Sequence, residues 1–280
     1  MLDGNTILIA HIGYPTHTFK SPMIYNPYFE KIGFNAMVVP MGVKPGDYPA
    51  SLRAIFKFTN IRGALITMPH KITTLGLVDE ISTTAQIAGS ANGVLLRPDG
   101  SLLADMFDGE GFVRGVRRKG REIRGASALV VGSGGVGSAI AASLAAAGVA
   151  RLGLFDANPA AAEALAHRLR THYPALELGL DSKDPAGYDI VVNATPLGMN
   201  EGDPLPIDVD RIVATSFVGE VVMKQEFTPF LVAARAKGCG IQVGTDMLFE
   251  MIPAYLEFFG FPTTSADELR VTSRVSYGSR

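Results

Sequence analysis

The segment 130–137, with the sequence VVGSGGVG, holds the residues whose chemistry is easiest to name. It follows an apolar strand predicted at 128–131 and opens a helix of small residues predicted at 138–147. A G-x-G-x-x-G spacing in this setting is typical of a turn that binds the pyrophosphate of a dinucleotide. Glycines allow a tight turn and a close approach of the backbone, and the helix N-terminus offers N–H groups to the phosphates. We therefore predict that a dinucleotide binds at this turn, where Gly132 permits the tight turn, Gly134 lets the backbone approach the pyrophosphate and Gly137 lets helix and strand pack closely.

A carboxylate follows this turn at the distance that a ribose contact requires. Asp156 ends a second predicted strand, 151–155, and lies 19 residues after Gly137. It can accept hydrogen bonds from the adenosine ribose hydroxyls and would repel a 2′-phosphate. Alternatively, Asp156 caps the next helix, although Asn158 and Pro159 form a better N-cap and N1 pair for it. The cofactor predicted from these residues is NAD, in preference to NADP.

A lysine and an aspartate outside the glycine turn are candidates for the reacting groups. Lys71 lies in the segment MPHK (68–71), at the carboxyl end of a predicted strand, where ligands bind in open α/β sheets. Asp108 lies at the predicted junction between two domains. Such a pair, facing one cleft, could move a proton while a nicotinamide moves a hydride. Spacing alone does not separate them from ordinary surface lysines and aspartates.

Composition excludes several classes of partner. The chain has 280 residues, of which 47% are hydrophobic and 19% charged, as in a globular protein long enough for two domains. A formal net charge of −2 and a pI of about 6.2 provide no global basic field for nucleic acid. Basic residues gather only at 114–124, which we interpret as a solvated helix end and a linker rather than a polyanion site.

Cysteine usage and the N-terminus bear on location. Cys239 is the only cysteine, so no intramolecular disulfide can form, and the chain fits a reducing cytoplasm. The first residues carry no basic region of a signal peptide, and no apolar segment is long enough to cross a bilayer. The five histidines lack metal-ligand spacing, so no metal is predicted. We expect a cytoplasmic protein with a small-molecule partner, no nucleic acid and no membrane; the oligomeric state stays open, a homodimer included.

The elements that must position these residues alternate between strand and helix. In the first part of the chain, strands are predicted at 6–10, 36–40 and 63–68. Helices are predicted at 22–32, at 48–58 and through Leu75, Leu77, Val78 and Ile81. A hairpin is predicted at 93–96 and 101–104, around the turn residues Pro98, Asp99 and Gly100. The alternation is typical of a mostly parallel sheet with helices on both faces.

The second part of the chain carries the glycine turn. Its later strands are predicted at 188–193, 211–214 and 240–243. A long helix is predicted at 246–259, with a kink at Pro253, and its apolar surface must be buried, which points back to the first domain. We therefore predict an α/β protein of two open-sheet domains. Residues 1–107 and 247–280 would form a mostly parallel substrate-binding domain, and 108–246 a Rossmann domain.

Short segments spread over nearly the whole chain resemble the shikimate/quinate dehydrogenase family in their order and spacing. The segments are GYP (13–15) with SPMIYN (21–26), TMPHK (67–71), GSAN (89–92), DGEG (108–111), NATPLGM (193–199), TPFL (228–231) and GTDML (244–248). The resemblance implies an NAD(P)-dependent oxidoreductase that transfers a hydride between nicotinamide and a ring alcohol of a cyclic hydroxy acid.

The resemblance also implies a role for each matching residue. Lys71 would be the acid–base group, paired with Asp108. Ser21 would donate to the substrate carboxylate, Thr67 would line the pocket and Asn92 would bind ring hydroxyls. The glycine turn would wrap the pyrophosphate with Gly132, Ser133, Gly134, Gly135 and Val136. The cofactor cleft would be shaped by Asn193, Thr195, Met199 and Gly244, the last of these near the nicotinamide carboxamide.

Several family positions carry apolar residues in this chain. Three that would line the substrate pocket in place of a serine, a tyrosine and a glutamine are Phe19, Met223 and Met251. Three more, in place of two asparagines and a threonine, are Leu65, Met106 and Phe107. Each lost hydroxyl or amide removes about 1–3 kcal/mol of contact to a charged partner. We therefore expect weak activity on shikimate itself, with Lys20 as a candidate replacement cation for a substrate carboxylate.

Other functions stay open at this point. The substrate could be shikimate, quinate, an amino-substituted analogue or a less polar ring alcohol. An NAD-binding sensor without turnover would keep the glycine turn and Asp156 but would not need Lys71 and Asp108 together. A methylenetetrahydrofolate-type dehydrogenase would need a different lysine context, and the NATPLGM segment argues against it. The family's NADP-using members have Asn-Arg-Thr where this chain has Asp156, Ala157 and Asn158, which again favours NAD.

Overall fold

The computed structural model describes residues 2–180 and 182–275 and divides into two compact units. The first unit contains the described residues up to Ala85, Gly89–Phe107 and those from Ile252 onward. The second contains Gln86–Ala88 and Asp108–Met251, so that one boundary falls inside the long helix α8 (Gly244–Phe259). Each unit is an α/β open sheet, which confirms the predicted fold class.

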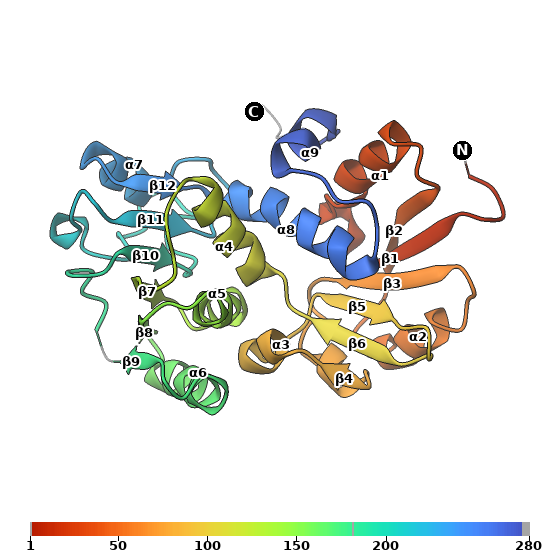
Figure 1. Cartoon of the computed structure of the whole chain (residues 1–280), viewed down its shortest axis with the longest axis horizontal. Helices are drawn as coiled ribbons and strands as arrows, with labels where there is room; N and C mark the ends of the chain where they lie inside the picture. The colour runs from red at the N-terminus through yellow and green to blue at the C-terminus, as the bar shows by residue number, and fades with distance from the viewer. Residues whose placement is uncertain (1, 181, 276–280) are drawn as a thin grey trace. The chain divides into compact units, whose positions relative to one another are not determined.

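A six-stranded sheet with the order β2-β1-β3-β5-β6-β4 forms the first unit (Figure 1). Its strands are β1 (Ile7–Gly13), β2 (Ala36–Gly42), β3 (Ile61–Ile66), β4 (Glu80–Ile81), β5 (Gly93–Leu96) and β6 (Leu102–Asp105). β1 pairs in parallel with β2 and β3, and β4 in parallel with β6. β5 runs antiparallel to β3 and β6, so the predicted hairpin makes the sheet mixed.

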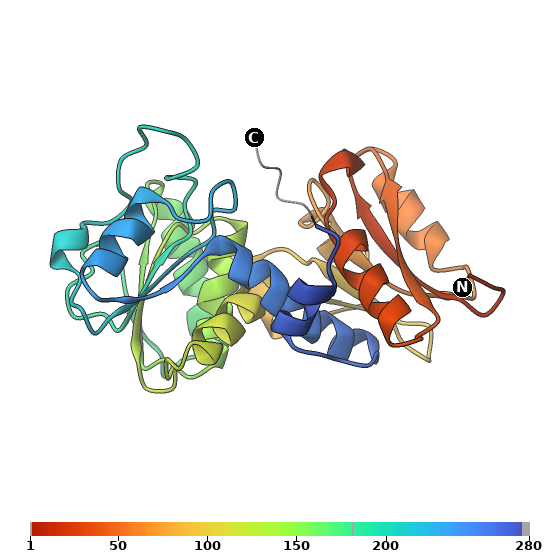
Figure 2. The same ribbon diagram turned by 90° about the horizontal axis from the view of Figure 1, so that it is seen from above.

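Helices cover both faces of this sheet. α1 (Pro22–Lys31) connects β1 to β2, and α2 (Tyr48–Ile55) connects β2 to β3. β2 and β3 flank β1 on opposite sides, so right-handed crossovers place α1 and α2 on opposite faces, as Figure 2 shows. α9 (Ala266–Thr272) packs on α1, and the Tyr28 hydroxyl donates to the Pro262 carbonyl at 3.0 Å.

The helix predicted through Leu75 and Ile81 is wrong. The segment forms a 3-10 turn at Thr73–Gly76 and then β4, and α3 (Thr83–Ala88) follows. Asp79 explains the change, because its N–H donates to the Leu102 carbonyl at 3.0 Å and its carboxylate accepts the Leu102 N–H at 2.8 Å. Pairing with a distant strand therefore overrides a local spacing that resembles a helix.

The second unit is built on a parallel sheet with the order β12-β11-β10-β7-β8-β9. Its strands are β7 (Ser127–Val131), β8 (Arg151–Phe155), β9 (Glu177–Gly179), β10 (Ile190–Asn193), β11 (Phe217–Glu220) and β12 (Gly240–Gln242). Its helices are α4 (Asp108–Arg118), α5 (Gly135–Ala146), α6 (Pro159–His172), α7 (Pro229–Ala236) and the first part of α8. β9 was not predicted.

Alternate residues of each central strand supply two separate cores. Ala128 and Val130 of β7 face the cluster that includes buried residues of α4, α5 and α6. Leu129 and Val131 face the cluster built with α7. A strand buried on both faces must be apolar throughout, which is why the LVV run was recognisable before the glycine turn. No helix in the described ranges is long and apolar enough to cross a membrane.

The strand predicted at 211–214 is also wrong. Residues Val209–Arg211 form a 3-10 turn, and the strand of this region is β11, six residues later. β11 escaped prediction because Gly219 and Glu220 interrupt its apolar pattern, yet Glu220 is 0% exposed. Its Oε2 accepts the Thr228 hydroxyl at 2.9 Å, while Oε1 has no partner among the described residues. Burial raises the pKa of Glu220 to about 7.

The glycine turn depends on a close contact between two main-chain segments. Gly132 has a φ of +107°, and a Cβ on Gly137 would lie 1.9 Å from the Gly132 carbonyl oxygen. A Cβ on Gly135, in the same turn of α5, would meet no heavy atom within 4 Å. Of these two glycines, only Gly137 is therefore required by packing.

Gly137→Ala is expected to lower the free energy of unfolding by about 2–4 kcal/mol, because the new methyl group must displace the backbone. Gly135→Ala is the matched control and should change it by less than about 0.5 kcal/mol. Urea unfolding followed by circular dichroism measures both. Equal effects of the two substitutions would contradict the packing argument.

Glu220→Gln should change the pH dependence of stability. The folded carboxyl keeps its proton up to a pKa of about 7, whereas an unfolded one releases it near 4.5. Stability from the protonated, buried form is therefore complete below pH 4.5 and is lost as the pH rises through 7. Between pH 4.5 and 7 the free energy of unfolding of the wild type should fall by up to about 3 kcal/mol relative to that of Glu220→Gln. Thermal melts from pH 4.5 to 8 test this, and parallel curves would contradict it.

Candidate functional site

The predicted substrate residues of the first unit gather at the carboxyl ends of β1 and β3. Thr67 follows β3 directly, and its N–H donates to the Ile12 carbonyl of β1 at 2.9 Å. The chain then turns, with the His70 N–H donating to the Thr67 carbonyl at 3.0 Å, so that Lys71 lies just beyond the strand. Lys71 is half-buried, and its carbonyl accepts the Ala91 N–H at 2.9 Å. The lysine therefore lies beside the GSAN segment.

Asn92 joins three parts of the first unit. It is buried, and its carbonyl accepts the Ile66 N–H at 2.8 Å and the Tyr255 hydroxyl at 3.2 Å. Its N–H donates to the Asp105 carbonyl at 3.0 Å, and its Oδ1 accepts the Phe107 N–H at 2.9 Å. The side-chain carbonyl therefore helps to hold the segment that follows β6.

His70 anchors the turn that precedes Lys71. The imidazole is buried, its Nε2 lies 2.8 Å from the Val43 carbonyl, and its ring stacks on Tyr48 at 4.0 Å. The Tyr48 hydroxyl pairs with the Thr74 hydroxyl at 2.7 Å, and Thr74 Oγ1 donates to the His70 carbonyl at 2.9 Å. Sequence analysis missed this positioning role, because no spacing links Tyr48 to the lysine motif.

The N-terminal loop brings Phe19 to the same place as Thr67. Phe19 follows the 3-10 turn Thr16–Thr18 and stacks on His11. A Cβ on Gly13 would lie 2.4 Å from Thr67 Cγ2 and 2.9 Å from Phe19 Cζ, so both side chains converge over the end of β1. Lys20 follows and is half-buried.

The Ser21 hydroxyl does not cap helix α1. It is the N-cap of α1, but its φ of −52° and ψ of −44° are helical, and no capping bond forms through the side chain. Since a helix N-cap hydroxyl ordinarily accepts a backbone N–H, this one is left to other uses. The position is consistent with the predicted substrate contact.

Three of the apolar replacements have a structural reason. Leu65, Met106 and Phe107 are buried in the first unit. The Phe107 ring lies 4.3 Å from that of Tyr255 and 5.0 Å from that of Phe258, both on α8. Phe107 therefore packs against α8, and all three side chains belong to the buried interior of the first unit.

The glycine turn of the second unit fits a dinucleotide. Gly134 is the N-cap of α5 and Gly135 its first residue; both are exposed, and a Cβ on either would meet open space. Ser133 is buried, and its carbonyl accepts the Ser138 hydroxyl at 3.0 Å. Val136 is half-buried on the same first turn. The unblocked helix N-terminus provides the N–H groups that a pyrophosphate needs.

Asp156 is tied to this turn by main-chain hydrogen bonds. Its Oδ2 accepts the Ser133 N–H at 2.6 Å, and its Oδ1 accepts the Asn158 N–H at 2.8 Å. The Asn158 side chain makes no capping bond, although this residue is the N-cap of α6. Asp156 therefore serves the start of α6 as well as the glycine turn. An ionised carboxylate has about four acceptor sites, so ribose hydroxyls can still donate to it.

Asn193 organises the loop that follows β10. Its Oδ1 accepts the Thr195 N–H at 3.0 Å and the Thr195 hydroxyl at 2.7 Å, while its Nδ2 donates to the Leu197 carbonyl at 3.1 Å. The loop reaches the glycine turn, since a Cβ on Gly132 would lie 2.6 Å from the Ala194 carbonyl oxygen. Met199, at the end of the loop, is exposed. The predicted cofactor residues of both segments therefore lie side by side.

The remaining predicted residues of the second unit lie around α4 and α8. Gly244 begins α8, where a Cβ would lie 2.1 Å from the Val222 carbonyl oxygen, and the adjacent Met223 is exposed. Met251 packs against α4, since a Cβ on Gly111 would lie 2.7 Å from its Cβ. Asp108 is the first residue of α4 and is 5% exposed. A carboxylate buried to this degree is more than a surface group.

Four basic residues of the segment 114–124 form ion pairs. Arg118 pairs with Glu250, and Lys119 Nζ lies 2.9 Å from Asp246 Oδ2, both on α8. Arg114 pairs with Glu110 within α4 at 2.7 Å. Arg121 Nη2 lies 2.7 Å from Asp189 Oδ1. Arg117, Arg118 and Lys119 are exposed, as expected of a solvated helix end, and the ion pairs of Arg118 and Lys119 join the end of α4 to α8.

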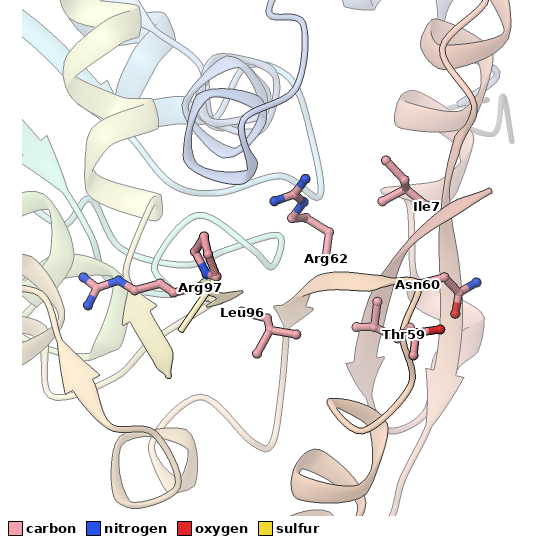
Figure 3. A pocket seen from close by; sticks show the side chains of 8 residues that line it. Ile7, Thr59, Asn60, Arg62, Leu96 and Arg97 are labelled. Carbon is pink, nitrogen blue, oxygen red and sulfur yellow. The ribbon is translucent and has the colours of Figure 1, made fainter. Parts of the chain in front are cut away.

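One cavity lies away from all of these residues. It has a volume of about 320 Å³ and lies where β1 and β3 begin, lined by Ile7, Thr59, Asn60, Ile61, Arg62, Leu96, Arg97 and Pro98 (Figure 3). Arg97 is paired there with Glu80 at 2.5 Å. Open α/β sheets bind ligands at the carboxyl ends of their strands, so this cavity at the opposite end contributes nothing to the candidate site.

Two family models and a set of relatives match this chain. A model described as the shikimate dehydrogenase substrate binding domain matches residues 11–94, and one described as the ThiF family matches 113–159. The shikimate dehydrogenase (NADP(+)) of Rubrobacter xylanophilus is 37% identical over 252 residues, which cover 88% of each chain.

Solved structures show the same fold. The shikimate 5-dehydrogenase of Listeria monocytogenes, in complex with shikimate and NAD, has a TM-score of 0.90 and 25% identity over 96% of this chain and 97% of that one. The quinate dehydrogenase of Corynebacterium glutamicum, in complex with NAD, has a TM-score of 0.85 and 28% identity over 95% and 98% of the two chains. The chain therefore belongs to the shikimate/quinate dehydrogenase family of NAD(P)-dependent oxidoreductases.

Proposed function

We propose that this chain transfers a hydride between NAD and a ring alcohol of the shikimate or quinate type, with Lys71 and Asp108 as the acid–base pair. The first unit would bind the substrate and the second the dinucleotide. The observation that carries the proposal is the placement of Lys71. It follows β3 at the carboxyl end, fixed by His70 on one side and by the Ala91 N–H on the other, beside Thr67 and Asn92.

The residues of the chain suit this chemistry. When bound, NAD accepts the hydride from the carbinol carbon, and the alcohol becomes a ketone. Lys71 would take the hydroxyl proton, and in the reverse direction it would return that proton to the carbonyl oxygen. A nearby carboxylate such as Asp108 would stabilise the positive charge that the lysine gains. Asn92 and Thr67 would hold the ring hydroxyls in position.

The preference for NAD rests on Asp156. Its carboxylate is fixed against the glycine turn by the Ser133 N–H, so its negative charge cannot easily swing away from a bound adenosine ribose. A 2′-phosphate there would face like charge, whereas two hydroxyls would find acceptors. NADP is the alternative, because the Rubrobacter relative is named for NADP(+); the Listeria and Corynebacterium structures contain NAD.

Lys71→Met should reduce kcat by about 10²- to 10⁴-fold, since it removes the proton-transfer group while keeping a side chain of similar length. NAD affinity, measured by calorimetry, should be unchanged. Lys57→Met, at an exposed position in the first unit, is the matched control. Turnover is followed as NADH absorbance with quinate and shikimate. A kcat close to that of the control would refute the assignment, and a wild type that binds NAD without any turnover would favour a sensor.

Asp156→Asn should lower the ratio of kcat/KM with NAD to kcat/KM with NADP at least tenfold, because the substitution removes the charge that opposes a 2′-phosphate. Glu163→Gln, which removes an exposed charge from α6, should leave the ratio unchanged. The two cofactors are compared at one substrate concentration. If the wild type already uses NADP better than NAD, the cofactor proposal is wrong.

A further inference from the structure

Two rings form a wall at the carboxyl end of β1. His11 lies on β1, and the Phe19 ring stacks on it with ring centroids 4.1 Å apart and an interplanar angle of 26°. Residues two apart on a strand share a face, so His11 and Gly13 lie on the same face of the sheet. A Cβ on Gly13 would be 2.9 Å from Phe19 Cζ, so the ring extends from His11 across Gly13 toward Thr67.

The wall carries no positive charge at neutral pH. His11 is 6% exposed, and burial lowers its pKa to about 4. Its Nδ1 has no hydrogen-bond partner in the described part of the chain, and no neighbouring carboxylate opposes the effect of burial on its pKa. A neutral imidazole under a phenyl ring offers neither charge nor an array of donors to an anion.

A substrate carboxylate would be poorly placed against this wall. Its oxygens would lose water and meet the apolar face or edge of Phe19, and burying an ionised group without a partner is strongly unfavourable. A hydroxyl or an ester loses far less on the same transfer. The Ser21 hydroxyl, which is left out of the helix cap, suits a neutral polar group as well as an anion.

We propose that the stacked rings of His11 and Phe19 determine the substrate class, and that the preferred substrate is a ring alcohol with no charged carboxylate facing this wall. The inference rests on the proposed dehydrogenase function and narrows it. Phe19 would be the residue in contact with the substrate, and His11 a positioning residue that fixes the plane of the Phe19 ring.

The test compares compounds in which a charged carboxylate is replaced by a neutral methyl ester. Shikimate, quinate and their methyl esters are offered with NAD, and kcat/KM is measured from NADH absorbance. In the wild type, each ester should exceed its acid at least tenfold. Phe19→Ser should reduce this ester-to-acid ratio at least tenfold, while Phe58→Ser, at an exposed position in the same unit, should leave it unchanged.

The variant His11→Leu tests whether His11 positions the Phe19 ring. It keeps an apolar side chain of similar size but removes the stacked ring, so it should lower the ester-to-acid ratio through KM with kcat unchanged. When Phe19→Ser is already present, adding His11→Leu should not change the ester-to-acid ratio further. An unchanged ratio in His11→Leu would overturn the role of the pair. Circular dichroism confirms that each variant is folded, and calorimetric binding of ester and acid replaces kinetics for any variant without turnover.

The two proposals fail in different ways. A wild type that turns over the acids better than the esters overturns this inference and leaves the dehydrogenase function standing. A wild type that binds NAD but yields no NADH from any of the four compounds overturns the proposed function, and this inference with it.

Discussion

The hydrogen bonds of Asn92 are the constraint on which the first unit depends. One buried residue uses its N–H, its carbonyl and its side-chain oxygen to join the end of β3, the end of β6 and α8. A buried amide left unpaired costs about 1–3 kcal/mol, so each of these partners holds the others in register. The turn that bears Lys71 is attached to the same place through the Ala91 N–H. Positioning of the lysine is therefore a consequence of how this amide is satisfied.

In the second unit, a carboxylate joins separate chain segments in a similar way. Asp156 accepts one N–H from the glycine turn and one from the start of α6, so the ends of β7 and β8 are joined by a single side chain. The close contact of Gly137 with the Gly132 carbonyl fixes the same turn from the other side. A phosphate-binding loop held at both ends needs little rearrangement when a ligand arrives, and pre-organisation of this kind lowers the entropic cost of binding.

The apolar substitutions relative to the family divide into two groups once the structure is considered. Met106 and Phe107 are both buried, and the Phe107 ring packs against aromatic residues of α8, so their change of type is a matter of packing. Phe19 and Met223 are not buried in this way, and Phe19 lies beside Thr67 at the strand ends. Of these four residues, Phe19 and Met223 therefore remain the candidates for contact with a substrate. The sequence pattern placed all of them in one altered shell, because contact partners are not visible in a sequence.

What the sequence determined by itself is the part of this protein that depends on local pattern. Alternating strands and helices, an apolar strand before G-x-G-x-x-G and the ordered family segments were enough for two open α/β sheets, the glycine turn and the identity of Lys71, Asp108 and Asp156 as candidates. Only the tertiary structure decided where long-range pairing overrides local preference. The hydrogen bond between Asp79 and Leu102 holds residues 80–81 as a strand beside β6. Glu220 is buried at the end of β11, although a charged residue argues against a buried strand in the sequence. The contacts of His70 with Tyr48 and of His11 with Phe19 also depend on tertiary structure, because the paired residues are not spaced like neighbours on one helix or strand. The physical reason is the same in each case: burial and hydrogen bonding depend on neighbours in space, and these are set only when the chain has folded.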